Sequence, residues 1–114
     1  MATHNHIDLI EFPVKSAAEL KQTKVFFSEV FGWTYNQWGE DFADTTDSGA
    51  ASGINADKGS SMPLTVIYTK DLEKTKKLVV KNGGKIIADT YSFPGGRRFH
   101  FTEPSGNELA VWSE

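Results

Sequence analysis

The chain has 114 residues, of which 39% are hydrophobic and 12% aromatic. This is enough for one globular domain with one core, and it excludes a disordered chain or two ordinary domains. The net charge of -3 comes from interspersed acidic and basic residues. A nucleic acid partner is therefore not expected, because phosphate binding needs a concentrated basic surface. The absence of cysteine excludes disulfides, thiolate nucleophiles and cysteine metal sites.

The first half of the chain predicts a strand, a helix and three more strands. Ile7–Val14 alternates as a half-buried strand. Ser16 is an N-cap candidate for a helix over Ala17–Phe31, and Gly32 ends that helix. The apolar stripe expected to lie on the sheet consists of Phe26, Phe27, Val30 and Phe31. The remaining strands are expected over Trp33–Trp38, Asp41–Thr46 and Ala50–Ile54.

The second half repeats this order. Pro63–Thr69 predicts a strand, and Asp71 caps a helix over Leu72–Asn82 that Gly83 and Gly84 stop. The last strands are expected over Lys85–Thr90, Arg97–Thr102 and Asn107–Trp112, with the final two joined by a turn over residues 103–106. We expect one domain over residues 1–114, with modules at about 7–55 and 62–113 and a polar linker at about 55–61.

The N-terminal segment has no cationic stretch followed by a long apolar core, so no signal peptide is expected. No apolar run approaches the roughly 20 residues that span a bilayer. These features predict a cytoplasmic protein with no membrane partner.

Four segments, IEFPV, FFSEVFGW, DLEKTKKLVVKNGGKI and EPSGNELAVW, occur in an order and spacing that resemble the vicinal oxygen chelate superfamily. This superfamily contains glyoxalases, bleomycin-resistance proteins and extradiol dioxygenases, and the chain most resembles its short lactoylglutathione-lyase-related members. The resemblance implies an α+β fold of two tandem βαβββ modules. Their sheets would form an open, curled mixed β-barrel around a cavity, with the helices outside. It also implies a homodimer.

The chain departs from this resemblance at the metal site. The positions that match the ligands of metal-dependent relatives fall on Leu9, Leu64 and Ala110, whose side chains cannot donate a lone pair to a cation. A shift of one residue would make Glu11 or Glu108 a candidate ligand but would turn every side chain to the other face. We therefore expect no metal cofactor.

Three polar side chains remain as candidates for chemistry. Glu11 lies on the strand face opposite Phe12, and the resemblance implies that this face meets the cavity. Arg98 and His100 share the corresponding face of the last hairpin. Glu11 or His100 could act as a base, and Arg98 could hold an anionic oxygen. The alternative for each is a structural group satisfied by its neighbours.

Three aromatic side chains, Trp38, Tyr68 and Trp112, are expected either to wall the cavity or to pack in a core. His4 and His6 are expected on a solvated arm. Three functions remain open. The first is a metal-free protein that binds a small oxygenated or anionic molecule, and the second is a related lyase, isomerase or dioxygenase. The third is a dimeric structural or regulatory module without a ligand.

Overall fold

The computed structural model describes residues 2–57 and 61–114, so part of the expected linker, residues 58–60, lies outside the described residues. The chain divides into two compact units. One is Leu9–Leu64, and the other joins residues 2–8 to Thr65–Glu114. The N-terminal segment therefore belongs to the second unit, where the Asn5 N–H donates to the Tyr68 carbonyl at 2.8 Å.

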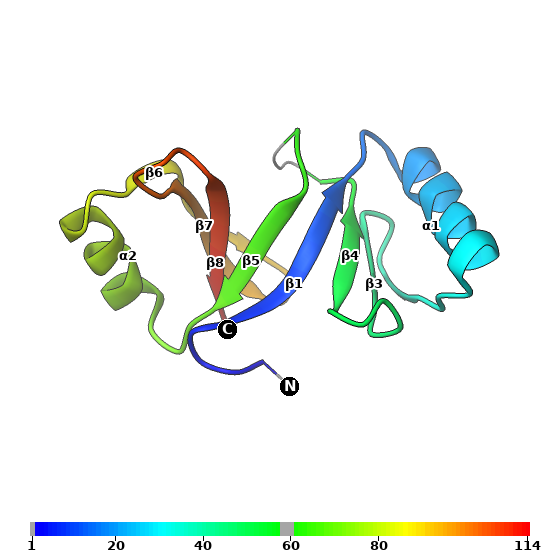
Figure 1. Cartoon of the computed structure of the whole chain (residues 1–114), viewed down its shortest axis with the longest axis horizontal. Coiled ribbons are helices and arrows are strands. Elements are labelled where there is room, and N and C mark those ends of the chain that lie inside the picture. Colours follow the sequence, from blue (N-terminus) through cyan, green and yellow to red (C-terminus); the bar gives the residue numbers. More distant parts are fainter. Residues whose placement is uncertain (1, 58–60) are drawn as a thin grey trace. The chain divides into compact units, whose positions relative to one another are not determined.

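The first module begins with strand β1 and helix α1 and continues with three short strands. In the sheet, β1 runs parallel to β4, and β3 pairs antiparallel with both β4 and β2. Helix α1 lies along one side of this sheet, where it contacts β3 and β4 (Figure 1). The elements are β1 (His6–Pro13), α1 (Ala17–Phe31), β2 (Asn36–Trp38), β3 (Phe42–Thr45) and β4 (Ser52–Asn55).

The second module has the same topology. Strand β5 runs parallel to β8, and β7 pairs antiparallel with both β8 and β6. Helix α2 contacts β6, β7 and β8. The elements are β5 (Leu64–Tyr68), α2 (Leu72–Lys81), β6 (Lys85–Phe93), β7 (Gly96–Thr102) and β8 (Glu108–Ser113). The predicted α+β class, with two βαβββ modules in tandem, is confirmed.

Both helices begin where their capping residues predict. The Ser16 hydroxyl accepts the Glu19 N–H at 3.1 Å, and the Asp71 carboxylate accepts the Lys74 N–H at 3.1 Å. These contacts satisfy N–H groups that have no partner within the first turn of a helix. Gly32 ends α1 with φ of 76°, a left-handed conformation that glycine adopts without strain. No helix of the described residues is long and apolar enough to cross a membrane.

The core of the first module contains Leu20, Ala43 and Ile54, with Phe27 packed against it. The predicted apolar stripe of α1 is wrong in three of its members, because Phe26, Val30 and Phe31 are exposed. A helix repeats every 3.6 residues, so Leu20 and Phe27, seven apart, share the face that meets the sheet. Most of the aromatic and aliphatic surface of α1 is thus left uncovered within the module.

The core of the second module lies between α2 and its sheet. Leu72 contributes from the helix, Phe99 and Phe101 from β7, and Val111 from β8, and all four are buried. Because side chains alternate across a strand, the residues between these aromatics must point to the other face of the sheet. That second face carries the polar groups.

Candidate functional site

A row of four side chains crosses the second module on the sheet face opposite its core. Strand pairing places Tyr91 of β6 beside Arg98 of β7, Arg98 beside Trp112 of β8, and Trp112 beside Tyr68 of β5. A single guanidinium group therefore lies in a row with three aromatic rings. The Arg98 Cζ atom lies 6.0 Å from the centre of the Tyr91 ring, close enough for a cation–π interaction.

His100 lies two residues along β7 from Arg98, on the same face, and connects Arg98 and Tyr91 to the Glu108 carboxylate. Its Nε2 atom lies 2.8 Å from the Tyr91 hydroxyl and accepts the Arg98 Nε–H at 3.3 Å. Its Nδ1 atom lies 3.2 Å from the Glu108 carboxylate. Because an arginine N–H can only donate, Nε2 must accept, and these contacts assign the ring proton to Nδ1. The imidazole is then neutral, and its Nδ1–H donates to Glu108.

Burial separates the members of this network. The exposed fraction is 6% for Arg98 and 3% for His100, whereas Tyr91 and Glu108 are half-buried. A buried guanidinium or imidazole is costly unless hydrogen-bonded, and the contacts above supply such partners. Tyr91 and Glu108 are thus the accessible ends of a chain of contacts whose middle is closed to water.

The other end of the row is aromatic and acidic. The Tyr68 and Trp112 rings meet edge to face at 4.9 Å between centres, and Phe93 lies 6.0 Å from Trp112. The Trp112 indole N–H donates to Asp8 at 3.0 Å, and the Tyr68 hydroxyl donates to Glu114 at 2.5 Å. The hydrogen bond to Glu114 raises the pKa of Tyr68, to which burial and the nearby negative charges add.

The first module holds the other two residues chosen from the sequence. Glu11 of β1 is 6% exposed, and its carboxylate accepts the Asn55 amide N–H at 3.3 Å. Trp38 of β2 is 60% exposed, and its indole N–H donates to Asp44 at 3.0 Å. Trp38 is therefore not packed in a core, one of the two positions expected for it. The roles proposed for both residues stay predictions.

The structure brings four of the six residues chosen from the sequence onto one sheet face, namely Arg98, His100, Tyr68 and Trp112. The sequence analysis did not select Tyr91. It considered Glu108 only as a metal ligand under a shifted register, whereas the structure pairs Glu108 with His100. The available signal for Glu108 was its spacing from Trp112, four residues along one strand and therefore on the same face.

Tyr91 was missed because the predicted strand ended at Thr90, whereas β6 continues to Phe93 and is irregular. Its pairing with β7 shifts between Ile86 and Ala88 and again between Ala88 and Tyr91. In the second shift, three steps along β6 match the two steps along β7 from His100 to Arg98. Such a β-bulge re-aims the residues that follow it. Tyr91 thereby joins Ala88 on the face that carries His100, although an odd spacing in a regular strand would have placed the two on opposite faces.

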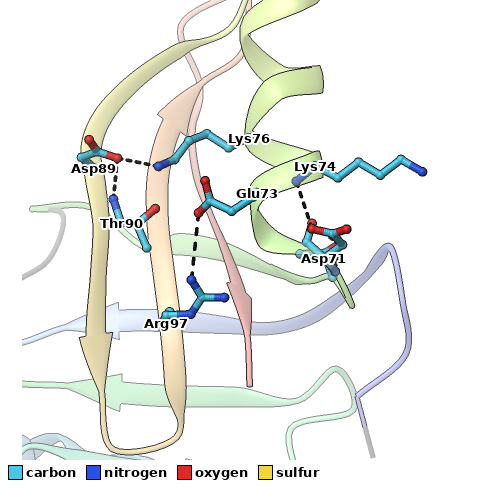
Figure 2. A network of polar contacts seen from close by, with 8 residues as sticks. Asp71, Glu73, Lys74, Lys76, Asp89, Thr90 and Arg97 are labelled. Atoms are coloured by element: carbon cyan, nitrogen blue, oxygen red, sulfur yellow. Dashed lines mark hydrogen bonds and ion pairs between the residues drawn. The ribbon is translucent and has the colours of Figure 1, made fainter.

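An ion pair with α2 holds this bulged segment. The Lys76 ammonium lies 2.6 Å from the Asp89 carboxylate, which also accepts the Thr90 N–H at 2.7 Å (Figure 2). On the same side of the sheet, Arg97 of β7 points toward Glu73 of α2, with 4.0 Å between their charged atoms (Figure 2). The helix thus contacts, through the Asp89 side chain, the segment that carries Tyr91.

We expect this ion pair to make stability depend on acid pH. The hydrogen bond from Lys76, with that from Thr90, lowers the pKa of Asp89. A carboxyl group whose folded pKa is depressed stabilises the fold above its unfolded pKa of about 3.9 and loses that contribution as pH falls through the folded value. Urea unfolding at pH 7 and pH 3 should therefore show a smaller acid loss in Asp89→Asn than in the parent. Equal losses would contradict the prediction.

The donors around the family's metal positions do not form a ligand set. Ala110 is buried and pairs with His100 on one side and with Val66 on the other. Leu64 is buried as well. Both ring nitrogens of His100 already have partners, and the described residues contain no group of three or more histidine, aspartate and glutamate side chains that could hold a metal ion.

The N-terminal histidines belong to another part of the second unit. His4 Nδ1 accepts the Lys70 N–H at 2.9 Å, so this side chain fastens the first residues to the segment after β5. His4 and His6 are both exposed, as expected for an arm at the surface.

One curated relative matches nearly the whole chain. A glyoxylase-like domain-containing protein from Didymella fabae is 30% identical over 131 aligned positions, which cover 97% of this chain and 95% of that protein. No protein-family model matches the chain.

Solved structures share the fold at low identity. A glyoxalase/bleomycin resistance protein/dioxygenase superfamily member from Vibrio splendidus 12B01 is similar with a TM-score of 0.64 and 14% identity, covering 93% of this chain and 97% of that chain. A protein described as the NAD-dependent benzaldehyde dehydrogenase from Legionella pneumophila has a TM-score of 0.75 and 14% identity, covering 92% and 96%. At these identities the likeness concerns the fold and not the activity.

Proposed function

This chain belongs to the glyoxalase-like group of the vicinal oxygen chelate superfamily, and on that premise we propose that it binds a small oxygenated or anionic molecule through Arg98, without a metal. The observation that supports the proposal is a nearly buried guanidinium in a row with Tyr91, Trp112 and Tyr68. Ligand sites are mostly apolar surfaces with a few placed polar groups, and a fixed guanidinium suits a carboxylate or an enolate oxygen.

Glu11 is the second residue of this proposal. Its carboxylate would act as a base on a bound ligand, as the sequence predicts. A double-mutant cycle of Glu11→Gln and Arg98→Lys tests this role through ligand affinity. A coupling of about 1 kcal/mol or more would support joint action, because separated sites add to within about 0.3–0.5 kcal/mol. If the two substitutions change the ligand affinity additively, Glu11 does not act together with Arg98.

Binding without a metal follows from the side chains at the family's ligand positions. Leu9, Leu64 and Ala110 offer only carbon, and a divalent cation needs oxygen, nitrogen or sulfur donors. We expect elemental analysis of the purified protein, after dialysis against chelator-free buffer, to find no stoichiometric divalent metal. About one equivalent of zinc, nickel, iron or manganese per chain, lost in Glu11→Gln or Glu108→Gln, would contradict the proposal.

Catalysis by a lyase, isomerase or dioxygenase is the second candidate function. The contact between the His100 Nδ1 atom and the Glu108 carboxylate favours it, since a carboxylate that orients an imidazole is a recurring part of acid–base sites. A structural or regulatory module without a ligand is the third candidate. It would be indicated if no small molecule shifts the melting temperature.

We also propose a homodimer, as the family resemblance implies. The exposed apolar side chains of α1 support it, because large uncovered apolar surface commonly marks an interface. These side chains are Val25, Phe26, Val30 and Phe31. Gel filtration with light scattering should give twice the chain mass of 12.6 kDa at micromolar concentration. A monomer mass would contradict the proposal.

Thermal-shift measurement with a panel of small carboxylates, 2-oxo acids and phenols tests the binding proposal. Ligands that carry an anionic oxygen should raise the melting temperature of the parent protein, since a ligand that binds only the folded state stabilises it. The same compounds should shift Arg98→Ala much less. If neutral analogues shift the parent as strongly as the anions do, binding does not depend on the guanidinium and the proposal fails.

A further inference from the structure

We propose that Tyr91 is the acid–base group that meets the ligand, and that His100 and Glu108 act through it. This inference rests on the proposed function, since it assigns a role at the same sheet face. Its basis is the continuous path from the Tyr91 hydroxyl through the His100 imidazole to the Glu108 carboxylate, with contacts of 2.8 and 3.2 Å.

Accessibility decides which member of this path can reach a ligand. His100 is 3% exposed, and both of its ring nitrogens are engaged within the protein. A ligand could approach Nε2 only by displacing the Tyr91 hydroxyl. Tyr91 is half-buried and lies beside Arg98, the group proposed to hold an anionic oxygen. A ligand held by Arg98 would thus meet the half-buried phenol before the imidazole, which is closed to water.

The assigned tautomer gives the direction of proton transfer. Nε2 carries no proton, so it can accept the one on the Tyr91 oxygen, and the resulting imidazolium keeps its Nδ1–H on Glu108. Between isolated groups this transfer is unfavourable, because the ordinary pKa is about 10 for a phenol and about 6.5 for an imidazole. The negative charge of Glu108 stabilises the imidazolium, and the cation of Arg98, 6.0 Å from the Tyr91 ring, stabilises the phenolate. Glu108 and the interaction of Arg98 with the phenolate thus favour the transfer, whereas the Arg98 Nε–H, which loses Nε2 as its acceptor, opposes it.

The proposed step consists of two proton transfers. The phenolic proton passes to His100 Nε2, and the phenolate oxygen then accepts a proton from the ligand, either from oxygen or from carbon next to a carbonyl. The electron pair of the broken bond stays on the ligand as an alkoxide, carboxylate or enolate, which the Arg98 guanidinium can hold. Nothing is oxidised or reduced. The reverse transfers return the proton, so the same residues serve as base and as acid.

Acetylation of tyrosine by N-acetylimidazole tests the relay without a ligand. The reagent transfers its acetyl group to the phenolic oxygen, the bond from that group to imidazole breaks, and the phenolic proton must leave. The chain has three tyrosines, which provide an internal comparison. Burial raises the pKa of Tyr35, and the bond to Glu114 raises that of Tyr68, so both should react slowly. Peptide mass spectrometry should find Tyr91 acetylated first at neutral pH.

Two variants show whether His100 acts as a base or only as a structural partner, because the two roles predict different changes in the acetylation rate of Tyr91. If His100 removes the phenolic proton, His100→Gln should slow acetylation of Tyr91 by about 10²-fold, since a positioned base contributes at least about that factor. Glu108→Gln keeps an acceptor for the Nδ1–H but removes the charge, and we expect a loss of about tenfold. If His100 only holds the Tyr91 hydroxyl in place by a hydrogen bond, His100→Gln should leave the acetylation rate of Tyr91 unchanged or increase it.

Faster or unchanged acetylation in both variants would overturn the relay, as would a Tyr91 that reacts more slowly than Tyr68. Glu108→Gln is informative even if His100→Gln does not fold, and circular dichroism establishes which variants are folded. Tyr35→Phe, in the first module, serves as the control and should leave the Tyr91 rate unchanged. Because acetylation needs no ligand, the relay can fail while Arg98 still binds anions, and anion binding can fail while the relay holds.

Discussion

Replacement of Arg98 by alanine is expected to weaken the binding of a small anionic ligand by about ten- to a hundredfold. A charge-assisted hydrogen bond contributes on the order of 1.5–3 kcal/mol, and each 1.4 kcal/mol is a factor of ten in affinity. Arg98→Lys keeps the charge but loses the planar pair of donors, so it should recover only part of the affinity. Isothermal titration with the best anion of the thermal-shift panel measures both variants.

Arg97 provides a matched control for this experiment. It is the neighbouring residue of β7 and carries the same side chain, but it points to α2 and lies 4.0 Å from Glu73 (Figure 2). Arg97→Ala therefore removes an equal charge from the opposite face of the sheet. We expect its ligand affinity to stay close to that of the parent. Equal losses in Arg97→Ala and Arg98→Ala would show that net charge, and not the site, controls binding.

Replacement of Phe99 by alanine should lower the free energy of unfolding by about 3–5 kcal/mol, the usual cost of removing a buried phenylalanine ring. Phe99 is fully buried between α2 and the sheet and lies between Arg98 and His100 in sequence. Because side chains alternate along a strand, burial of Phe99 against α2 turns Arg98 and His100 to the other face of the sheet. Urea unfolding measures the loss, which is a large part of the stability of an ordinary small domain.

Ile87→Ala is the comparison for this core substitution, because Ile87 lies on β6 of the same module but is half exposed. Its removal should change the free energy of unfolding by less than about 1 kcal/mol, since the side chain loses little buried surface. If Phe99→Ala were no more destabilising than Ile87→Ala, Phe99 would not anchor the sheet.

Much of the fold follows from local signals in the sequence. Ser16 and Gly32 bound α1, and the turn before β8 closes through Gly106, whose φ is 94° and whose N–H donates to the Glu103 carbonyl. Helix caps and turns depend on residues only a few positions apart, so they can be predicted from the sequence alone. The repeat of one element order in both halves likewise anticipated the two modules and their common topology.

The candidate site was only partly predictable, because it depends on pairing between strands. Alternation within β7 placed Arg98 and His100 on the face opposite Phe99, as the core of the second module requires. Alternation could not have placed Tyr91, because the predicted strand ended at Thr90 and the bulge before Tyr91 changes the face of every residue after it. No local feature of the sequence marks that bulge, since its contact with Lys76 comes from α2, 13 residues away in sequence.

The buried face of helix α1 was also only partly predictable from the sequence. The sequence marks four apolar side chains at helical spacing, but the sheet of its own module accommodates only the line through Leu20 and Phe27. Which apolar residues a helix buries depends on the width of the surface beneath it, and β2, β3 and β4 are short strands. Sequence periodicity therefore predicted the helix correctly and its buried face only in part.

Native mass spectrometry of the protein as purified tests the central claim, a metal-free site for a small anion at Arg98, most directly. It should show the chain without a bound divalent metal, and the parent should retain an added or co-purified small anion that Arg98→Ala loses and Arg97→Ala keeps. A stoichiometric metal in the parent, or equal retention of the anion in Arg98→Ala, would contradict the claim.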